Sequence, residues 1–369
     1  MKILVTGSKG FIGKNLVAEL NNLEYKDILH FNRDDDWSLL EKYTKECDFV
    51  FHLAGINRPE KEEEFMEGNA NLTSQLLNFL KKSNNKAPVL ITSSIQAEQD
   101  NPYGESKRAA EELMFDYEQQ TGTKIYVYRL PNVFGKWSKP NYNTVVATYC
   151  YNVARDIDIQ VHNPDTQLIL CYIDDVIKEL TSILNNPIIV EEKIFKIARE
   201  YQITLGILAK IIKSFKESRN DLMVPNMENE LTKKLYSTYL SFLPENEFSY
   251  ELKMNVDQRG SFTEFLKTPD RGQVSVNVSK PGITKGNHWH HTKNEKFLVV
   301  SGKGQIRFRN KDTTKVIEYN VSGEKFKVVD IPTGYTHSIV NTGNTDLVTI
   351  MWANELFDQD NPDTYYVEV

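Results

Sequence analysis

Cysteine is scarce in this sequence, and neither a long apolar run nor a block of basic residues occurs in it. The 369 residues include three cysteines, Cys47, Cys150 and Cys171, which are odd in number and widely spaced. Such cysteines do not form a disulfide framework and are typical of a reducing compartment. No apolar stretch approaches the ~20 residues that a bilayer span requires. We therefore expect a cytoplasmic protein without membrane insertion.

The charge balance and the first residues exclude two further classes of protein. The formal net charge is −7, which together with the lack of a basic block argues against a nucleic-acid surface. Met1 to Gly7 lead directly into an expected strand, so we expect no cleavable leader. An anionic substrate would have to be held by locally placed Lys and Arg side chains and by backbone amides.

The length and the order of the expected elements predict two domains. A chain of 369 residues exceeds what one hydrophobic core usually serves. Up to about residue 185, short apolar runs alternate with amphipathic helical stretches, which indicates βαβ units and a parallel sheet. After about residue 255, short strands are separated by Gly, Pro and Asn turns. We place the boundary at 246, with an α/β domain over 1–246 and an all-β domain over 247–369.

A glycine-rich turn follows the first expected strand and opens a helix near Phe11. Its G-x-x-G-x-x-G pattern consists of Gly7, Ser8, Lys9, Gly10, Phe11, Ile12 and Gly13. Glycine lets the backbone turn tightly and approach a pyrophosphate closely, and the helix N-terminus offers free N–H groups to that anion. The strand before the turn and the helix after it supply the context that a dinucleotide-binding turn requires.

Tyr103 and Lys107 are four residues apart and should project from one face of a helix. An ammonium near the phenol would stabilise the phenolate. We therefore expect the pKa of Tyr103 to fall below its ordinary value of ~10, so that Tyr103 exchanges a proton near neutrality. In isolation such a pair is usually a surface feature.

These motifs resemble, in the same order, those of the extended short-chain dehydrogenase/reductases, over roughly residues 1 to 240. Other segments that carry the resemblance are His52-Leu53-Ala54-Gly55, Ser93-Ser94, Arg129 to Gly135 and Tyr172 to Val176. The resemblance implies a Rossmann-like, doubly wound parallel sheet. It implies that Tyr103 donates the proton, that Lys107 binds the nicotinamide ribose, and that Ser94 hydrogen-bonds the substrate carbonyl. It also places Leu53, Ala54, Gly55 and Asn69 beside the cofactor, and Asn132 beside the substrate.

Two details distinguish this sequence within that resemblance. Eight residues separate Ser94 from Tyr103, fewer than the family usually has, which predicts an open or mobile pocket wall. Arg33 follows the second expected strand, where a member that prefers NAD carries an acid for the ribose 2′-hydroxyl. A guanidinium can instead pair with a 2′-phosphate, so we expect NADPH. The alternative is an exposed arginine paired with the three aspartates that follow it.

The last third of the chain carries four of the seven histidines. The pattern G-x5-H-x-H-x4-E-x6-G runs from Gly282 to Gly302, and P-x-G-x2-H-x3-N runs from Pro332 to Asn341. His288 and His290 should point to one face of a strand, while Glu295 and His337 can approach from neighbouring strands. Three imidazoles and a carboxylate suit zinc, iron or manganese. The alternative is a metal-free barrel whose histidines do acid/base work directly. His291 should lie on the opposite face.

These two patterns resemble the signature motifs of the cupins, a family of small β-barrels, over residues 255–369. A narrower resemblance, to the deoxysugar 3,5-epimerases, runs through 257–264, 284–288 and 331–337. It implies that Arg259, Lys285 and Tyr335 bind substrate. In those enzymes the position of His288 is a catalytic base, usually without metal. Here His290 and Glu295 restore the metal-binding pattern, so His288 is either a base or a ligand.

The two halves fit one chemistry, because a 4-keto group acidifies the neighbouring C–H bond and is also what a hydride reduces. A bound metal would stabilise the enolate charge. The whole chain resembles the bifunctional capsular-polysaccharide-synthesis enzymes. These enzymes epimerise UDP-2-acetamido-2,6-dideoxy-4-hexulose at carbon 3 and reduce it to UDP-2-acetamido-2,6-dideoxy-β-L-talose, on the route to UDP-N-acetyl-L-fucosamine. The resemblance implies a UDP-sugar substrate, NADPH, a divalent metal with zinc as the expected ion, and a homodimer.

Two other functions fit parts of the pattern. One is a dTDP-4-keto-6-deoxysugar reductase whose cupin is a non-catalytic module. The other is a non-enzymatic regulator that senses NADPH. The Tyr103 and Lys107 pair argues against the regulator, because a sensor needs the glycine turn but not a proton donor. The metal-binding pattern beside Lys285 argues against an inert cupin.

Overall fold

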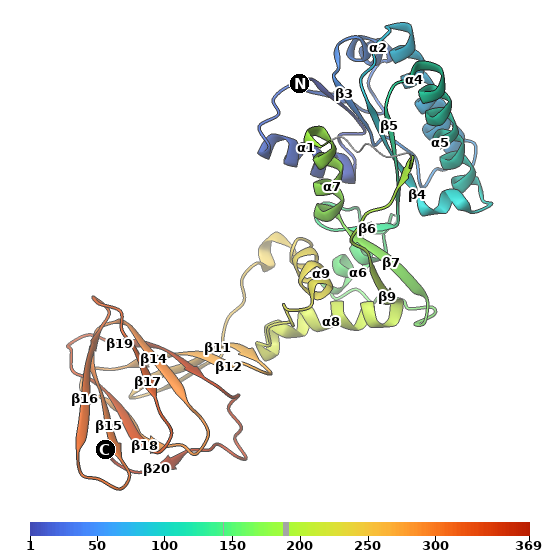
Figure 1. The fold of residues 1–369 in the computed structure, drawn as a ribbon. Coiled ribbons are helices and arrows are strands. Elements are labelled where there is room, and N and C mark those ends of the chain that lie inside the picture. The colour runs from blue at the N-terminus through green and yellow to red at the C-terminus, as the bar shows by residue number, and fades with distance from the viewer. Residues whose placement is uncertain (143, 187–191) are drawn as a thin grey trace. The chain divides into compact units, whose positions relative to one another are not determined.

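The computed structural model describes residues 1–142, 144–186 and 192–369. The chain divides into two compact units (Figure 1). The first consists of Met1–Lys213 and Asn229–Pro244, and the second of Ser214–Glu228 and Glu245–Val369. Among the described helices, none combines the length and the apolar character that crossing a bilayer requires.

The first unit is built on a parallel sheet with the order β2-β1-β3-β4-β5-β8. Its strands are β1 (Ile3–Thr6), β2 (Ile28–Phe31), β3 (Phe49–His52), β4 (Val89–Ser94), β5 (Ile125–Leu130) and β8 (Ile194–Phe195). All residues of β1, β3 and β4 are buried, as near-continuous apolar runs predict for strands covered on both faces. The order reverses between β1 and β3, and ligands of open α/β sheets bind beyond the strand ends at such a switch point.

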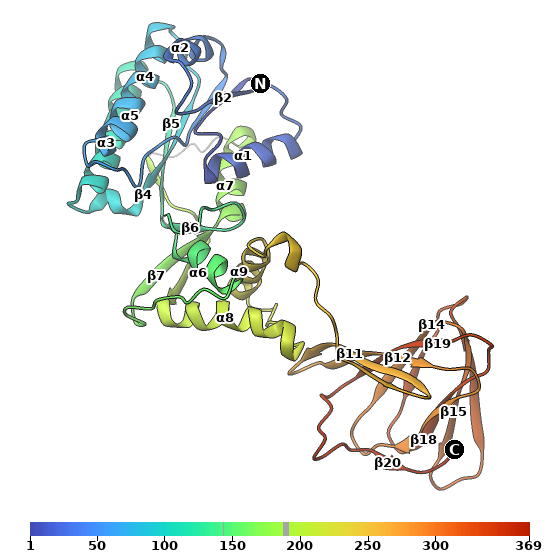
Figure 2. The ribbon, with the colours of Figure 1, turned by 180° about the vertical axis from the view of Figure 1, so that it is seen from behind.

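Helices cover both faces of this sheet (Figures 1 and 2). They are α1 (Phe11–Asn22) and α7 (Ile173–Asn185) on one face, and α2 (Trp37–Glu46), α4 (Leu72–Lys82) and α5 (Pro102–Thr121) on the other. Alternate residues of a strand point to opposite faces, so Ile3 and Val5 pack with α1 and α7, whereas Leu4 packs with α2, α4 and α5. The predicted doubly wound, Rossmann-like sheet is confirmed.

The remaining helical elements lie between and after these helices in the chain. They are α3 (Glu64–Met66), the π-helical turn η1 (Glu67–Asn71), the 3₁₀ turn η2 (Ile95–Glu98), α6 (Val145–Val153), α8 (Leu205–Asp221), α9 (Glu230–Leu240) and the 3₁₀ turn η3 (Glu245–Glu247). A small sheet of order β6-β7-β9 consists of β6 (Asn132–Phe134), β7 (Gln167–Tyr172) and β9 (Tyr201–Thr204). This small sheet carries Asn132 at its first strand.

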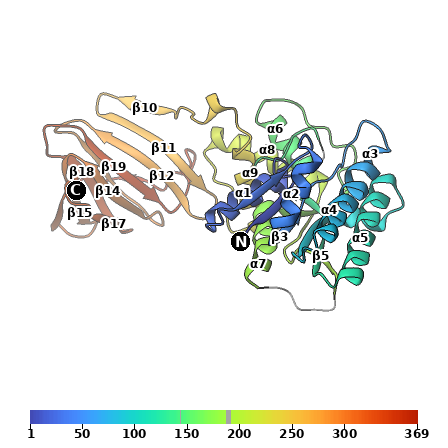
Figure 3. The same ribbon diagram turned by 90° about the horizontal axis from the view of Figure 1, so that it is seen from above.

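The second unit is built on two antiparallel sheets (Figure 3). The first, in spatial order, contains β10 (Met254–Asp257), β11 (Gly260–Thr268), β12 (Gly272–Ser279), β19 (Leu347–Ala353), β14 (Glu295–Ser301) and β17 (Val328–Ile331). The second contains β16 (Val316–Ser322), β15 (Lys303–Asn310), β18 (Tyr335–Asn341), β13 (Thr284–Trp289) and β20 (Tyr365–Tyr366). Side chains from both sheets, such as Phe297 and Ile339, share one core. The all-β prediction for this region is confirmed.

Candidate functional site

The glycine turn between β1 and α1 has the close backbone packing that a dinucleotide-binding turn requires. Gly7 has a φ of +72°, and a Cβ atom there would lie 2.8 Å from the backbone of Ala54. A Cβ atom at Gly13 would overlap the carbonyl oxygen of Gly7. The N-cap of α1 is Gly10, which has no side chain to cap the first turn. The N–H groups of Phe11 and Ile12 are therefore available to an anion.

Asn32, at the end of β2, ties this turn to the neighbouring strand. Its Oδ1 atom accepts hydrogen bonds from Ser8 Oγ at 3.1 Å and from Lys9 N at 2.9 Å. Arg33 follows it, with a side chain that is 81% exposed and 4.0 Å from Glu64 Oε2. Arg33 thus lies next to the turn and is weakly held, in contact with Glu64 and not with the aspartates that follow it. Sequence reasoning missed Asn32, although its position at the end of the strand was a signal.

The loop after β3 contacts both the turn and helix α5. The N–H of Ala54 donates to Thr6 Oγ1 at 3.2 Å, and the N–H of Leu53 donates to the carbonyl of Thr6 at 3.2 Å. A Cβ atom at Gly55 would lie 2.7 Å from Asn69 Oδ1 and 3.1 Å from Lys107 Nζ. The structure therefore brings Gly55, Asn69 and Lys107 together.

Asn69 lies in the π-helical turn η1, a rare local structure that is frequent at functional sites. Its amide oxygen accepts from Ile56 N, and its Nδ2 atom donates to the carbonyl of Ile56 and to Ser106 Oγ, each at 2.9 Å. Asn69 thus connects the loop after β3 to α5. Its side chain is 2% exposed and acts inside the protein framework.

Tyr103 and Lys107 lie on the first turns of α5, which Asn101 caps by accepting from Gly104 N at 2.8 Å. Lys107 is 8% exposed, and its Nζ atom donates to the carbonyl of Thr92 at 3.3 Å. The same atom lies 5.9 Å from the centroid of the Tyr103 ring. Burial lowers the pKa of Lys107 to about 8, and the nearby Glu111 carboxylate opposes that shift.

The expected fall in the pKa of Tyr103 is wrong for this geometry. Burial raises the pKa of Tyr103, and a hydrogen bond with Ser94 offsets part of that rise. The i, i+4 spacing indicated the shared helix face, but it carried no information on how far the phenol is removed from water. Ser94 is 9% exposed at the end of β4, so the proposed donor and the proposed carbonyl-binding hydroxyl are adjacent.

A buried ion pair lies behind this face of α5. Arg129 on β5 binds both carboxylate oxygens of Glu111, at 2.9 Å and 2.6 Å, and Ser93 Oγ donates to the same carboxylate. Glu111 is 2% exposed and follows Tyr103 and Lys107 on the same helix face. The spacing of eight residues from Tyr103 could have revealed Glu111. Asn132, in contrast, is exposed on β6, with its amide bonded to the carbonyl of Ile169 at 3.2 Å.

The four predicted ligands of the second unit converge. His288 is the penultimate residue of β13 and pairs with His337 on β18. His290 follows β13, and Glu295 begins β14. Their ligand-type atoms all lie within 4.8 Å of one another. Glu295 Oε2 is 3.4 Å from His290 Nε2 and 3.3 Å from His337 Nε2. His291 lies outside the cluster, with its ring 4.5 Å from that of Trp289.

The hydrogen bonding of the cluster fits a bound cation. His290 Nδ1 lies 2.6 Å from the carbonyl oxygen of Asp363, and a carbonyl only accepts, so Nδ1 carries the proton. In neutral His290 the lone pair of Nε2 then faces Glu295 Oε2. Neither atom has a hydrogen-bond partner among the described residues, and both are buried. Such facing lone pairs are costly unless a proton on the imidazole or a metal ion lies between them.

Ionisation in the cluster also favours metal binding. Burial, together with the neighbouring His337 and His290, lowers the pKa of His288 to about 3. Burial alone would raise the pKa of Glu295, but His290 and His337 together hold it well below its usual range. Metal ligands must be deprotonated, so neutral His288 and ionised Glu295 suit this role. Nitrogen and oxygen donors of this kind are typical of zinc, iron or manganese sites.

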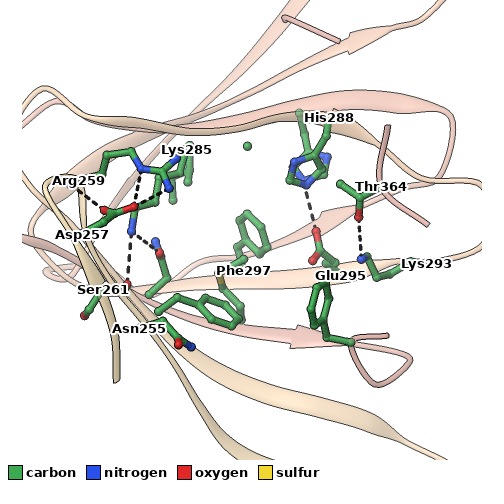
Figure 4. Close-up of a pocket in the computed structure, with 17 residues that line it drawn as sticks. Asn255, Asp257, Arg259, Ser261, Lys285, His288, Lys293, Glu295, Phe297 and Thr364 are labelled. Atoms are coloured by element: carbon green, nitrogen blue, oxygen red, sulfur yellow. Dashed lines mark hydrogen bonds and ion pairs between the residues drawn. The ribbon is translucent and has the colours of Figure 1, made fainter. Parts of the chain in front are cut away.

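A pocket of about 400 Å³ opens onto this cluster. Figure 4 shows Asp257, Arg259 and Lys285 at one end of the pocket and His288 and Glu295 at the other. Such a volume is large enough for a sugar and part of its nucleotide.

Two of the three predicted substrate residues line this pocket. The guanidinium of Arg259 is bonded to Asp257, with contacts of 2.6 Å and 2.9 Å. Lys285 Nζ donates to Asn277 Oδ1 at 2.8 Å and to two backbone carbonyls, and burial lowers its pKa. Tyr335 is not part of the lining among the described residues, because it packs against the core of the second unit.

Comparisons with known proteins connect both units to nucleotide-sugar enzymes. Residues 3–198 match the NAD dependent epimerase/dehydratase family, and residues 255–365 match the polysaccharide biosynthesis C-terminal domain. The UDP-2-acetamido-2,6-β-L-arabino-hexul-4-ose reductase of Pseudomonas aeruginosa is 46% identical over 369 residues, which cover 100% of this chain and 99% of that protein.

Solved structures give the same result. The crystal structure of the capsular polysaccharide assembling protein CapF from Staphylococcus aureus matches with a TM-score of 0.95 and 53% identity, over 100% of both chains. The UDP-glucose 4-epimerase of Thermotoga maritima matches 66% of this chain with a TM-score of 0.56 and 20% identity, a likeness of fold alone. The chain therefore belongs to the NAD dependent epimerase/dehydratase family and, over its whole length, to the family that includes the hexulose reductase of Pseudomonas aeruginosa and CapF of Staphylococcus aureus.

Proposed function

We propose that this chain epimerises a UDP-2-acetamido-2,6-dideoxy-4-hexulose at carbon 3 and reduces the resulting ketosugar at carbon 4. The product would be UDP-2-acetamido-2,6-dideoxy-L-talose, for capsular polysaccharide synthesis. The observation that carries the proposal is the presence of two separate sites, Tyr103 with Lys107 on α5 and the His/Glu cluster in the second unit. The name of the 46% identical relative supports the reduction, and the cluster and its pocket support the epimerisation.

For the reduction, we propose NADPH as the cofactor, which supplies a hydride when it is bound. Tyr103 gives its phenolic proton to the carbonyl oxygen as carbon 4 becomes an alcohol, while Ser94 holds that oxygen. Lys107 binds the nicotinamide ribose, and the cation close to the phenol favours the phenolate that remains. Arg33, exposed and beside the Ser8–Lys9 turn, is the group that would pair with a 2′-phosphate.

For the epimerisation, we propose that His290, Glu295 and His337 hold a divalent metal, with zinc as the first candidate. A divalent ion at this position supplies positive charge for an enolate oxygen. His288 either completes the ligand set or removes the proton from carbon 3. Its low pKa keeps the imidazole neutral, which suits a ligand better than a base, because a general base works best with a pKa near the operating pH. Arg259 and Lys285, at the other end of the pocket, are placed to bind the anionic diphosphate.

Three further parts of this proposal concern architecture. We propose that the two antiparallel sheets form a cupin-type barrel, that 246 is a workable boundary between the domains, and that the protein is a homodimer. Light scattering of the full chain at several concentrations tests the dimer. A mass of one chain at all concentrations contradicts it.

The function is tested by incubating the full chain with UDP-2-acetamido-2,6-dideoxy-4-hexulose and NADPH, and by assigning the product with NMR. We expect an alcohol at carbon 4, an inverted carbon 3 and one NADPH consumed per sugar. An alcohol with the original configuration at carbon 3 would leave a reductase with a non-catalytic second unit. No consumption of NADPH would contradict the proposal as a whole.

A further inference from the structure

The segment 362–369 pairs with β13, the strand that carries His288, and contacts His290 just beyond the end of that strand. Its strand β20 pairs with β13, so that Tyr366 lies opposite His288 and Tyr365 opposite Trp289. The N–H of Val367 donates to the carbonyl of Asn287 at 3.0 Å. Thr336, next to His337, donates its hydroxyl to the carbonyl of Val367. The segment therefore fixes the backbone on both sides of the His288–His337 pair.

One residue of this segment, Asp363, contacts the loop that joins the other two ligands. Residues 291–294 connect His290 to Glu295. The carboxylate of Asp363 accepts from the N–H groups of His291, Thr292 and Lys293, at 3.0, 2.9 and 2.9 Å, and from Thr292 Oγ1 at 3.1 Å. A single carboxylate thus receives four hydrogen bonds from three consecutive residues, which fixes the conformation of this loop.

The backbone of Asp363 acts on His290 directly. Its carbonyl oxygen is the acceptor for His290 Nδ1 at 2.6 Å, and this bond fixes the tautomer in which Nε2 faces Glu295. Asp363 has a φ of +38°, a conformation that few side chains other than those of Asn and Asp adopt readily. The carbonyl and the carboxylate of one residue therefore hold the ring of His290 and the loop that leads to Glu295.

Lys293, in the same loop, binds the residues on either side of Asp363. It is 8% exposed, and its Nζ atom donates to the carbonyl of Pro362 and to Thr364 Oγ1, each at 3.1 Å. Figure 4 shows the Lys293–Thr364 bond beside Glu295. The residues on both sides of Asp363 are thus bonded to the same loop, so Asp363 cannot leave His290 without breaking several hydrogen bonds.

We propose that Asp363 is a positioning residue for the metal cluster: it holds His290 and the 291–294 loop in the geometry in which a divalent cation binds. The inference rests on the metal site proposed above, and it adds a residue that none of the ligand spacings contains. Outer-shell partners of ligating histidines affect metal affinity by about 10- to 100-fold, because they set the tautomer and the orientation of the ring.

The test measures metal binding and not turnover. The full chain is stripped with a chelator, and its affinity for Co²⁺ is measured by competition with a chromophoric chelator, together with the visible absorption of the bound ion. We expect D363N and D363G to bind Co²⁺ about 10- to 100-fold more weakly than wild type, with altered absorption bands. Both variants keep the peptide carbonyl of residue 363 and tolerate its positive φ. A loss of Co²⁺ affinity in them is therefore due to the removal of the carboxylate. A chain that ends at Pro362 also lacks the carbonyl and should bind still more weakly.

The matched control is D358N, the same change at an exposed aspartate whose carboxylate also accepts a backbone N–H, that of Asp360 at 2.9 Å. It should bind Co²⁺ as wild type does. Melting curves of the metal-free variants identify any variant that fails to fold. If the truncated chain does not fold, D363N and D363G alone decide the test. If D363N and D363G bind Co²⁺ with wild-type affinity and absorption, the positioning role of Asp363 is overturned, while the proposed metal site is not affected. If wild type itself binds no Co²⁺, the proposed metal site falls, and this inference with it.

Discussion

The two candidate sites are built in opposite ways. In the first unit, most polar groups already have protein partners: Asn69 is bonded to Ile56 and Ser106, and Lys107 to the carbonyl of Thr92. Arg33 has a side chain that is 81% exposed, and among the residues that the structure describes its one ion-pair contact is with Glu64, 4.0 Å away. In the second unit, His290, Glu295 and His337 bring buried atoms together that lack hydrogen-bond partners among the described residues.

This difference indicates what each site requires from its ligand. In the first site, Gly7 packs closely against the backbone of Ala54 and Gly55 against Asn69 and Lys107, and the polar groups named above have protein partners without a ligand. In the second site, buried polar atoms of His290, Glu295 and His337 without hydrogen-bond partners lower the stability of the folded state, and a bound cation would offset this loss. Changes in the first site should therefore alter rates more than stability. Changes in the second should alter both metal binding and stability.

The largest expected effect is on catalysis in the first unit. Tyr103→Phe should lower the rate of ketone reduction by about 10²- to 10⁴-fold, because the proton donor is lost. Tyr103 has its ring against that of Phe65, 5.5 Å away, and phenylalanine preserves this packing. NADPH binding, measured by fluorescence titration, and the melting temperature should stay close to wild type. Full reductase turnover in the variant would remove Tyr103 from the site.

An exception within the first unit sharpens the comparison, because Glu111 is buried and charged. Glu111→Ala removes the buried partner of the Arg129 guanidinium and leaves it the exposed carboxylate of Glu98, 2.7 Å away. Breaking a buried ion pair costs about 3–5 kcal/mol, and Glu98 should keep the loss at the lower end of that range. Glu118→Ala is the control on the same helix, because its pair with Lys193 is half-exposed, and such pairs contribute about 0–1 kcal/mol. Urea unfolding of both variants gives the difference. Equal destabilisation would mean that Glu111 is not a buried anchor.

Metal addition should stabilise the protein through the second unit. If zinc binds the cluster, zinc at 100 times its dissociation constant raises the free energy of unfolding by about 2.7 kcal/mol. Calorimetry of the metal-free chain with and without zinc should show this gain in wild type. Glu295→Ala should abolish the gain, because the carboxylate ligand is lost. The same gain in the variant would place the zinc elsewhere.

The smallest effect in this series concerns cofactor choice. Arg33→Asp should reduce the preference for NADPH over NADH by about 10- to 100-fold, since a hydrogen bond to a charged group contributes about 1.5–3 kcal/mol. Arg33 is exposed, so folding should be unaffected. Steady-state rates with both cofactors give the ratio. A wild-type protein that prefers NADH would contradict the assignment.

Sequence reasoning located the residues whose chemistry depends on fixed spacing. The sequence predicted the glycine turn, the Tyr103–Lys107 face and the clustering of the four proposed ligands of the second unit, because a turn, a helix face and a strand each impose a period. Residues whose partners are distant in sequence were missed, such as Asn32 beside the glycine turn and Asp363 beside His290. Spacing also cannot report burial, and this is why the direction of the Tyr103 pKa was wrong.

A second limit appears at the pocket of the second unit. Arg259 and Lys285 were expected as substrate residues, and both line the pocket, but Arg259 is paired with Asp257, two residues before it. Tyr335 comes from the same motif as His337 and faces the core instead. A motif indicates that a segment lies near the site. Which side chains of the segment face the substrate depends on the strand's twist and on its neighbours.

The central claim is that the two units carry separate reactions on one sugar, and deuterium incorporation tests it most directly. The 4-keto sugar nucleotide is incubated in D₂O with wild type, Tyr103→Phe and Glu295→Ala, and mass spectrometry counts the deuterium at carbon 3. Tyr103→Phe should incorporate deuterium without consuming NADPH. Glu295→Ala, shown by its melting curve to be folded, should incorporate none but should still reduce a ketosugar already epimerised at carbon 3. Wild type that never incorporates deuterium, or a Glu295→Ala protein that incorporates it at the wild-type rate, would contradict the account.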